Sequence, residues 1–166
     1  VMRAALHTVL EWGWRVLLLA FHHAADESNA HLDLAALAKL AESLPAQYRA
    51  QVAQKILRAD DIPGIANAFS GIDLHCGMRF HGHVLSAIFG KPFIGIAVDN
   101  KTDAICRSFG MPVVQIKDFS SDSLVLAVDQ AMASRIDPSQ RASCEHDAAR
   151  NFSQLAVRLS AVNAAA

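Results

Sequence analysis

The residues best suited to chemistry lie in one short segment, Leu74 to His83, at the end of a predicted strand. Gly77 is followed by Arg79 and His81, and an apolar helical pattern begins at the same place. Free backbone N–H groups at a helix start favour an anion. The fork of Arg79 can bind phosphate or carboxylate through two parallel hydrogen bonds, and His81 can exchange a proton near neutral pH. The segment predicts an anion site beside a proton-transfer group.

The spacing of these two residues sets a geometric condition on the site. Side chains two positions apart on a helix point about 200° away from each other, so Arg79 and His81 diverge in a regular turn. They converge only if Arg79 still lies in the turn before the helix, which Gly77 permits. Taken alone, such a segment more often holds an ion-paired arginine and a capping histidine than a catalytic pair. Both interpretations stay open at this point.

A second polar group follows another predicted strand and raises the question of a metal site. It consists of His22, His23, Asp26, Glu27 and His31. Their spacing matches no familiar zinc pattern, so a solvated loop is the favoured interpretation and no metal is predicted. His22 and Glu27 should nonetheless face the same crevice as Arg79, where either can contact a substrate.

Two more histidines flank Arg79 and His81. His75 lies within a short buried strand and is interpreted as a hydrogen-bonded core residue. His83 is interpreted as a packed or exposed helix residue. His81 and His83 would share a metal only in an extended backbone, and the predicted helix argues against that geometry.

The composition is that of a globular domain. The chain has 166 residues, of which 52% are hydrophobic and 19% charged, which suits one domain with its own core. A net charge of −1 without basic runs argues against a nucleic-acid surface. The apolar run from Val16 to Ala20 is too short to span a membrane. The cysteines form no paired motif and are interpreted as small buried residues in a reducing compartment: Cys76, Cys106 and Cys144.

Strand and helix patterns alternate along the chain and must position these residues. Buried strands are expected at Trp14 to Phe21, Gln51 to Leu57, Ile72 to Cys76, Phe93 to Val98 and Val113 to Ile116. Helices are expected at Met2 to Glu11, Leu37 to Leu44, Ile62 to Phe69, Arg79 to Phe89, Thr102 to Phe109, Ser120 to Ala133 and Pro138 to Val162. Asp61 is an expected N-cap, and Gly90 an expected helix stop.

This alternation predicts the fold class and the location of the site. We expect one α/β domain over residues 1–166, with a Rossmann-like parallel sheet of about five strands and helices on both faces. Ligands of such sheets bind outside the carboxyl ends of the strands. That rule selects the loops from His22 to Asn29, after Leu57, from Cys76 to His81 and from Asp99 to Asp103. In the helix after Arg79, the apolar residues Phe80, Val84 and Ile88 align.

The segment from Gly77 to Ile96 resembles the signature of the polysaccharide pyruvyl transferase family. That signature has a Gly-x-Arg-x-His turn, an apolar helix, a Gly-x-Pro and a buried strand, matched here by Gly77 to His81, Gly90 to Pro92 and the strand at Phe93. The following Asp-x-Lys is matched by Asp99-Asn100-Lys101. The resemblance extends to about Ala133 and is most specific in its central stretch.

The resemblance implies an enzyme with a two-domain, GT-B-like fold. Such an enzyme transfers the enolpyruvyl group of phosphoenolpyruvate to a sugar of a cell-surface polysaccharide precursor, forms a pyruvate ketal and releases phosphate. It implies Arg79 and His81 as the catalytic and donor-binding pair, with His81 as an acid or base. Gly77, Asp99 and Lys101 are implied as further substrate-binding residues. Phosphoenolpyruvate is the donor substrate, and no cofactor is implied.

The resemblance also sets the expected partners and location. This chain corresponds to the C-terminal, donor-binding half, so an N-terminal domain is an expected partner. The sugar acceptor is expected on a lipid-linked or nucleotide-linked precursor, in the cytoplasm or at the inner membrane surface. Val98 departs from the tyrosine that the family often has before the Asp-x-Lys. Two alternatives stay open: the nucleotide-sugar-binding half of a GT-B glycosyltransferase, with Arg79 on the diphosphate, and a detached binding domain without activity.

Overall fold

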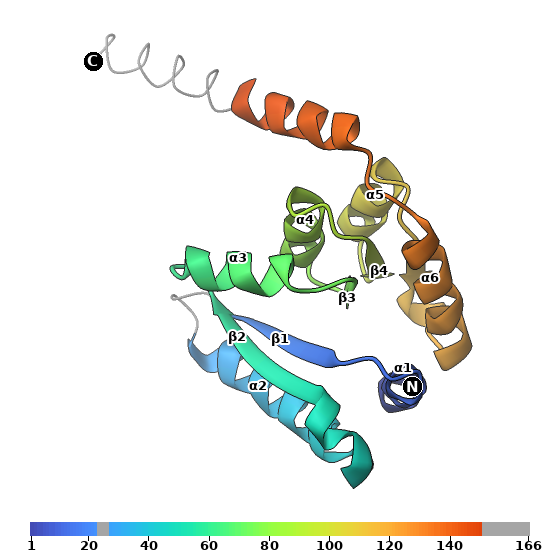
Figure 1. The fold of residues 1–166 in the computed structure, drawn as a ribbon. Coiled ribbons are helices and arrows are strands. Elements are labelled where there is room, and N and C mark those ends of the chain that lie inside the picture. The colour runs from blue at the N-terminus through green and yellow to red at the C-terminus, as the bar shows by residue number, and fades with distance from the viewer. Residues whose placement is uncertain (23–26, 151–166) are drawn as a thin grey trace.

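The computed structural model describes residues 1–22 and 27–150, and among these the side chains of residues 1–21 and 33–150. Strands and helices alternate along this part of the chain (Figure 1). The strands are β1 (Val16–His22), β2 (Val52–Arg58), β3 (His75–Gly77), β4 (Phe93–Ala97) and β5 (Val113–Gln115). The helices are α1 (Met2–Glu11), α2 (Glu27–Glu42), α3 (Ile62–Ser70), α4 (Phe80–Ile88), α5 (Asn100–Ser108) and α6 (Ser121–Ala133), and residues 138–150 are also helical.

Every pairing between the described strands is parallel. β1 pairs with β2, from Val16 opposite Val52 to His22 opposite Arg58. In the second sheet β4 lies between β3 and β5. Parallel strands joined through helices confirm the predicted α/β, Rossmann-like class.

The prediction of one continuous sheet of about five strands is wrong. β1 and β2 form a two-stranded sheet, and β3, β4 and β5 form a separate three-stranded sheet. β3 covers three residues, His75–Gly77, whereas a strand from Ile72 was expected. β3 pairs with β4 on one side only, and its other edge does not pair with β1. Side chains from both edges line a cavity instead.

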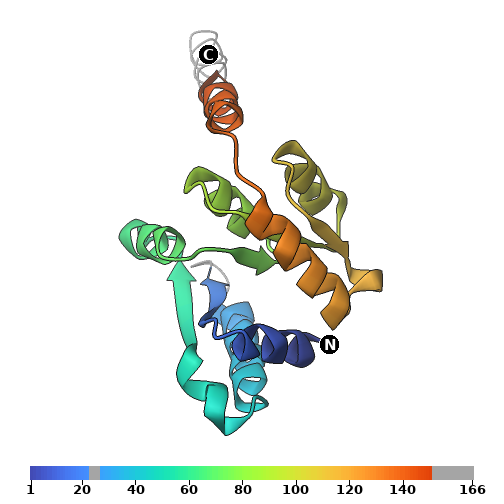
Figure 2. The same ribbon diagram turned by 45° about the vertical axis from the view of Figure 1, so that its right-hand side comes forward.

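Helices cover both faces of the three-stranded sheet, as predicted (Figure 2). All five residues of β4 are buried, and successive side chains point to opposite faces. Ile94 packs with residues of α6 and with Ala5 of α1. Phe93 packs on the other face with residues of α4 and α5. β4 is therefore the centre of this half of the fold.

Local signals place several helix ends correctly. The Asp61 carboxylate accepts a hydrogen bond from the Gly64 N–H at 2.9 Å and caps α3, as predicted. Gly90 follows α4 with a φ of +65°, a conformation that glycine adopts without strain. The loop predicted from His22 to His31 is wrong in part, because α2 begins at Glu27.

Within the described ranges, none of the helices is long and apolar enough to cross a membrane.

The packed face of α4 is not the one that its apolar residues suggest. Phe80 and Ile88 are 38% and 48% exposed. The buried residues of this helix are small or polar: Gly82, His83, Ser86 and Ala87. Small side chains let the helix approach the sheet closely, and the apolar residues that align on its other side are left near solvent.

Candidate active site

The turn between β3 and α4 places Arg79 and His81 at the carboxyl edge of the three-stranded sheet. Gly77 ends β3, and Arg79 is the N-cap of α4 with an extended backbone, φ −82° and ψ 117°. Arg79 thus lies in the turn before the helix, which is the condition for it to converge with His81. The side chains of Arg79 and His81 are both exposed. The ring of His81 contacts Phe80 edge-on, with ring centroids 6.0 Å apart.

The guanidinium of Arg79 forms an ion pair with Asp33 of α2. Its Nη2 donates to the Asp33 Oδ2 at 2.8 Å, across 46 residues of sequence. Both side chains keep contact with solvent, at 65% and 38% exposure. The ion-paired arginine that the sequence left open is therefore present, but it is exposed at the sheet edge and available to a ligand.

The next loop along the sheet edge places Asp99 and Lys101 after β4. The Asp99 Oδ1 accepts hydrogen bonds from the backbone N–H groups of Lys101 at 3.1 Å and Thr102 at 3.0 Å. The bond from the Thr102 N–H is the main reason that the pKa of Asp99 is lowered. This carboxylate is the N-cap of α5, while the Lys101 side chain is exposed. The structure thus gives Asp99 a structural task that sequence reasoning had not assigned to it.

The two remaining candidates come from the other sheet. His22 is the last residue of β1, and Glu27 is the first residue of α2. Their backbones flank residues 23–26, and His22 lies at the carboxyl end of β1. Their side chains, with the rest of the polar group from His22 to His31, lie outside the described residues.

A comparison with protein families shows the family of the chain. A family model described as polysaccharide pyruvyl transferase matches residues 3–100, which is more than half of the 166-residue chain. The chain belongs to the polysaccharide pyruvyl transferase family. The matched region contains Arg79, His81 and Asp99 and ends just before Lys101. Comparisons with curated proteins and with solved structures give no significant match.

Directly beneath the Arg79 turn of this pyruvyl transferase family member lies a pair of buried histidines. The rings of His75 and His83 have centroids 5.2 Å apart, and His83 also stacks on Phe93 at 5.4 Å. His75 is 8% exposed and His83 is fully buried. Within the described residues, the His75 Nε2 and both ring nitrogens of His83 lack a hydrogen-bond partner. His75 is a core residue as expected, and the missing partner concerns its Nε2 alone.

Burial keeps both histidines neutral. It lowers the pKa of His75 to about 3, with a further contribution from the nearby His83. It lowers the pKa of His83 to about 4, although the Gly77 backbone, short of hydrogen-bond geometry, and the charge of Asp99 act in the opposite direction. Because they are uncharged at neutral pH, these rings add no positive charge to the turn at Arg79.

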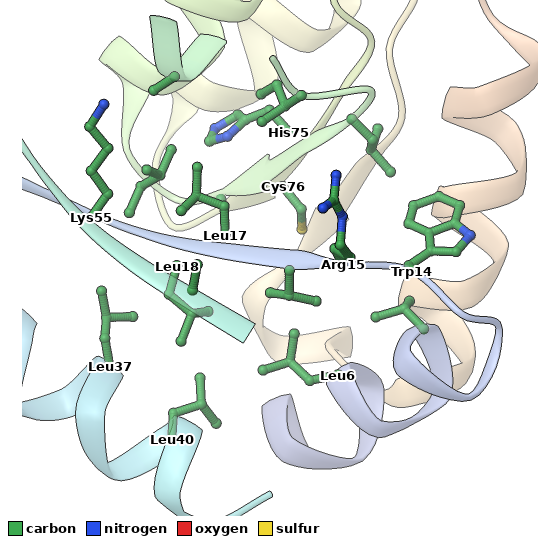
Figure 3. A pocket seen from close by; sticks show the side chains of 18 of the residues that line it. Leu6, Trp14, Arg15, Leu17, Leu18, Leu37, Leu40, Lys55, His75 and Cys76 are labelled. Atoms are coloured by element: carbon green, nitrogen blue, oxygen red, sulfur yellow. The ribbon is translucent and has the colours of Figure 1, made fainter. Parts of the chain in front are cut away.

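A cavity of about 1200 Å³ separates the two sheets below this edge (Figure 3). Most of its lining is apolar and comes from α1, β1, α2 and the segment before β3, including Leu6, Leu17, Leu18, Leu37 and Leu40. Asp33 and Arg79 also line it. Cys76 lines this cavity and is exposed to it. Desolvation of its thiol by the surrounding protein nevertheless disfavours the thiolate and raises the pKa of Cys76 to about 12, with a smaller contribution from Cys106.

The cysteines are not all buried, contrary to the prediction. Cys106 is buried, while Cys76 and Cys144 are exposed.

Among the residues that the structure describes, no group of three or more histidine, cysteine, aspartate or glutamate residues is placed to hold a metal ion.

We predict that Gly82→Ala destabilises the fold by about 1–3 kcal/mol, because of its contact with His75. A Cβ at this position would lie 2.6 Å from the His75 Nε2, and that ring is held between Phe69 and His83. The free energy of unfolding from urea titration measures the effect. In the double variant Gly82→Ala with His75→Ala, the loss in free energy of unfolding should be clearly smaller than the sum of the losses in the two single variants. Additive costs would show that the close approach of Gly82 to His75 is not the cause.

Proposed function

We propose that this member of the family transfers the enolpyruvyl group of phosphoenolpyruvate to a sugar of a cell-surface polysaccharide precursor, and that the site at Arg79 and His81 performs the transfer. The observation that carries the proposal is the placement of Arg79 at the N-cap of α4, at the carboxyl edge of the sheet and within the matched segment. We further propose that the chain is the donor-binding domain of a GT-B-like enzyme. In that arrangement an N-terminal domain supplies most of the acceptor site, and the reaction takes place in the cytoplasm.

The turn suits the charge of the donor. The N-cap residue Arg79 offers no side-chain acceptor to the first N–H groups of α4, so these groups and the guanidinium can serve the same anion. Phosphoenolpyruvate carries a phosphate and a carboxylate on one small carbon skeleton. We propose that the fork of Arg79 binds one of them and that Lys101, on the neighbouring loop, holds a further donor oxygen.

The reaction then requires proton transfers that a histidine can perform. A first sugar hydroxyl adds to the enol carbon while the methylene carbon gains a proton to become a methyl group. A second hydroxyl of the sugar displaces phosphate from the same carbon and closes the ketal. Each hydroxyl loses its proton, and positive charge develops on the reacting carbon beside the donor carboxylate. We propose that His81 moves one of these protons, and that the fixed positive charge of Arg79 stabilises the departing phosphate.

Titration calorimetry with phosphoenolpyruvate tests the donor site. The chain should bind phosphoenolpyruvate, and Arg79→Lys should weaken binding by about tenfold, because lysine keeps the charge but loses the two-pronged contact. Arg107→Lys is a matched control, since Arg107 lies in the last turn of α5, away from this edge, and its replacement should leave the affinity unchanged. Preferential binding of UDP or GDP would support the glycosyltransferase alternative instead. If the chain binds phosphoenolpyruvate but the full-length enzyme shows no turnover, the chain is a binding domain without activity.

A further inference from the structure

The ion pair between Asp33 and Arg79 connects the two halves of the fold at the candidate site. Asp33 belongs to α2, which packs on β1 and β2, whereas Arg79 precedes α4, which packs on β3 and β4. The 2.8 Å contact joins these halves where both residues line the rim of the cavity. An incoming anion that approaches the guanidinium therefore meets a carboxylate that already occupies it.

Another carboxylate at this edge, that of Asp99, is engaged elsewhere. The Asp99 Oδ1 accepts two backbone N–H groups of α5, so its charge is directed into that helix. Asp33 is different, because its carboxylate is bound to the same group that the proposed function assigns to the donor. Of these two carboxylates, it is Asp33 that competes directly with a ligand for Arg79.

The contact is of a kind that a ligand can displace. Ion pairs between exposed side chains contribute little to stability, because water screens them and two long side chains must be held in place. Arg79 is 65% exposed, and a single contact of its Nη2 leaves its other N–H donors unused by Asp33. A phosphate or carboxylate that also reaches the N–H groups of α4 makes more bonds than Asp33 does, and carries more charge in the case of phosphate.

We infer that Asp33 is an exchangeable counter-ion of Arg79, which occupies the guanidinium in the empty enzyme, yields it to the donor and takes it back when phosphate leaves. This inference rests on the proposed function, in which Arg79 binds the donor. The donor binds less tightly in the presence of Asp33 than it would to an Arg79 without a counter-ion. Because the competition between Asp33 and an anion for Arg79 is reciprocal, Asp33 also assists the release of phosphate. It is a positioning residue, since it acts through Arg79 and does not touch the reacting atoms.

The test compares Asp33→Asn with wild type by calorimetry, using phosphoenolpyruvate and inorganic phosphate as separate ligands. Asparagine keeps the size and a hydrogen-bond acceptor but removes the charge, so both ligands should bind about fivefold more tightly. Inorganic phosphate should also become a stronger product inhibitor of the full-length enzyme, by a similar factor. Asp33→Glu, which keeps the charge, should behave like wild type.

Three controls separate this role from a general effect of charge or stability. Asp129→Asn removes one exposed negative charge from the second half of α6, away from this edge, and should leave both affinities unchanged. High salt should shrink the difference between wild type and Asp33→Asn, since screening weakens the contact that the variant removes. In an Arg79→Gln background, Asp33→Asn should bring no gain.

The outcomes distinguish this inference from the proposed function. If wild type binds phosphoenolpyruvate and Arg79→Lys weakens the binding, but Asp33→Asn leaves affinity unchanged or lowers it, the exchange role of Asp33 is wrong and the donor site stands. If wild type does not bind phosphoenolpyruvate, the donor site and the role of Asp33 both fail. A gain in affinity that persists without Arg79 would also overturn the inference, because Asp33 would then act by some other route.

Discussion

Replacing His81 by glutamine should lower kcat of the full-length enzyme by about a hundredfold or more, while the affinity for phosphoenolpyruvate changes little. Glutamine keeps the approximate size and the hydrogen-bonding capacity of histidine but cannot move a proton near neutral pH. The side chain is exposed in the first turn of α4, beside the N-cap Arg79, so the substitution should not disturb the packing. Steady-state kinetics with saturating donor, together with calorimetry for donor affinity, measure the two effects separately.

The same measurements identify the opposite result. A near-normal kcat with a raised Michaelis constant for phosphoenolpyruvate would make His81 a binding residue. The proton-transfer group would then be sought at His22, Glu27 or in another domain. His146→Gln provides a matched control, because His146 is an exposed histidine in the helical residues 138–150, and its replacement should leave both parameters unchanged.

The second large effect concerns acid. Lowering the pH from 7 to about 4.5 should reduce the free energy of unfolding by on the order of 5 kcal/mol, because of His75 and His83. In the folded chain their pKa values are lowered from 6.5 to about 3 and about 4. Between these values and 6.5 the unfolded chain binds more protons than the folded one. The stability contributed by the neutral rings is therefore complete above pH 6.5 and is lost as the pH falls below it.

A loss of this size is comparable to the whole stability of many domains, so unfolding near pH 4.5 is expected. Urea titrations at a series of pH values measure the dependence. His83→Leu should remove about half of it, since one of the two buried groups can no longer take up a proton. His146→Gln should leave it unchanged, because His146 is exposed. A free energy of unfolding that stays constant from pH 6.5 to 4.5 in wild type would show that these rings are not held neutral by burial.

Much of the local structure follows from neighbouring residues, and here the sequence was sufficient. The periodicity from Met2 to Glu11 matches α1 in full, and Asp61 and Gly90 act at the ends of α3 and α4 as predicted. A cap or a left-handed turn depends on atoms within a few residues, so its outcome does not depend on the rest of the fold. The same holds for the turn at Arg79, which a glycine and the start of a helix define.

The face that each helix buries depended on its neighbours in space. Phe80, Val84 and Ile88 align along α4, yet this helix packs through Gly82, His83, Ser86 and Ala87. The reason is the close approach that small residues allow, which is visible in the contact of Gly82 with His75. His83 becomes a fully buried, neutral ring only because Phe93 and His75 enclose it.

By itself, the sequence determined the class of fold, the family and the pair of residues at the centre of the candidate site, because these depend on strand and helix patterns and on one contiguous motif. Only the tertiary structure decided that β1 does not pair with β3, and that Asp33 lies against Arg79. Contacts between residues 46 positions apart are set by how the two sheets are placed, and no local pattern encodes that placement. The charge that faces Arg79 was therefore visible only once the chain was folded.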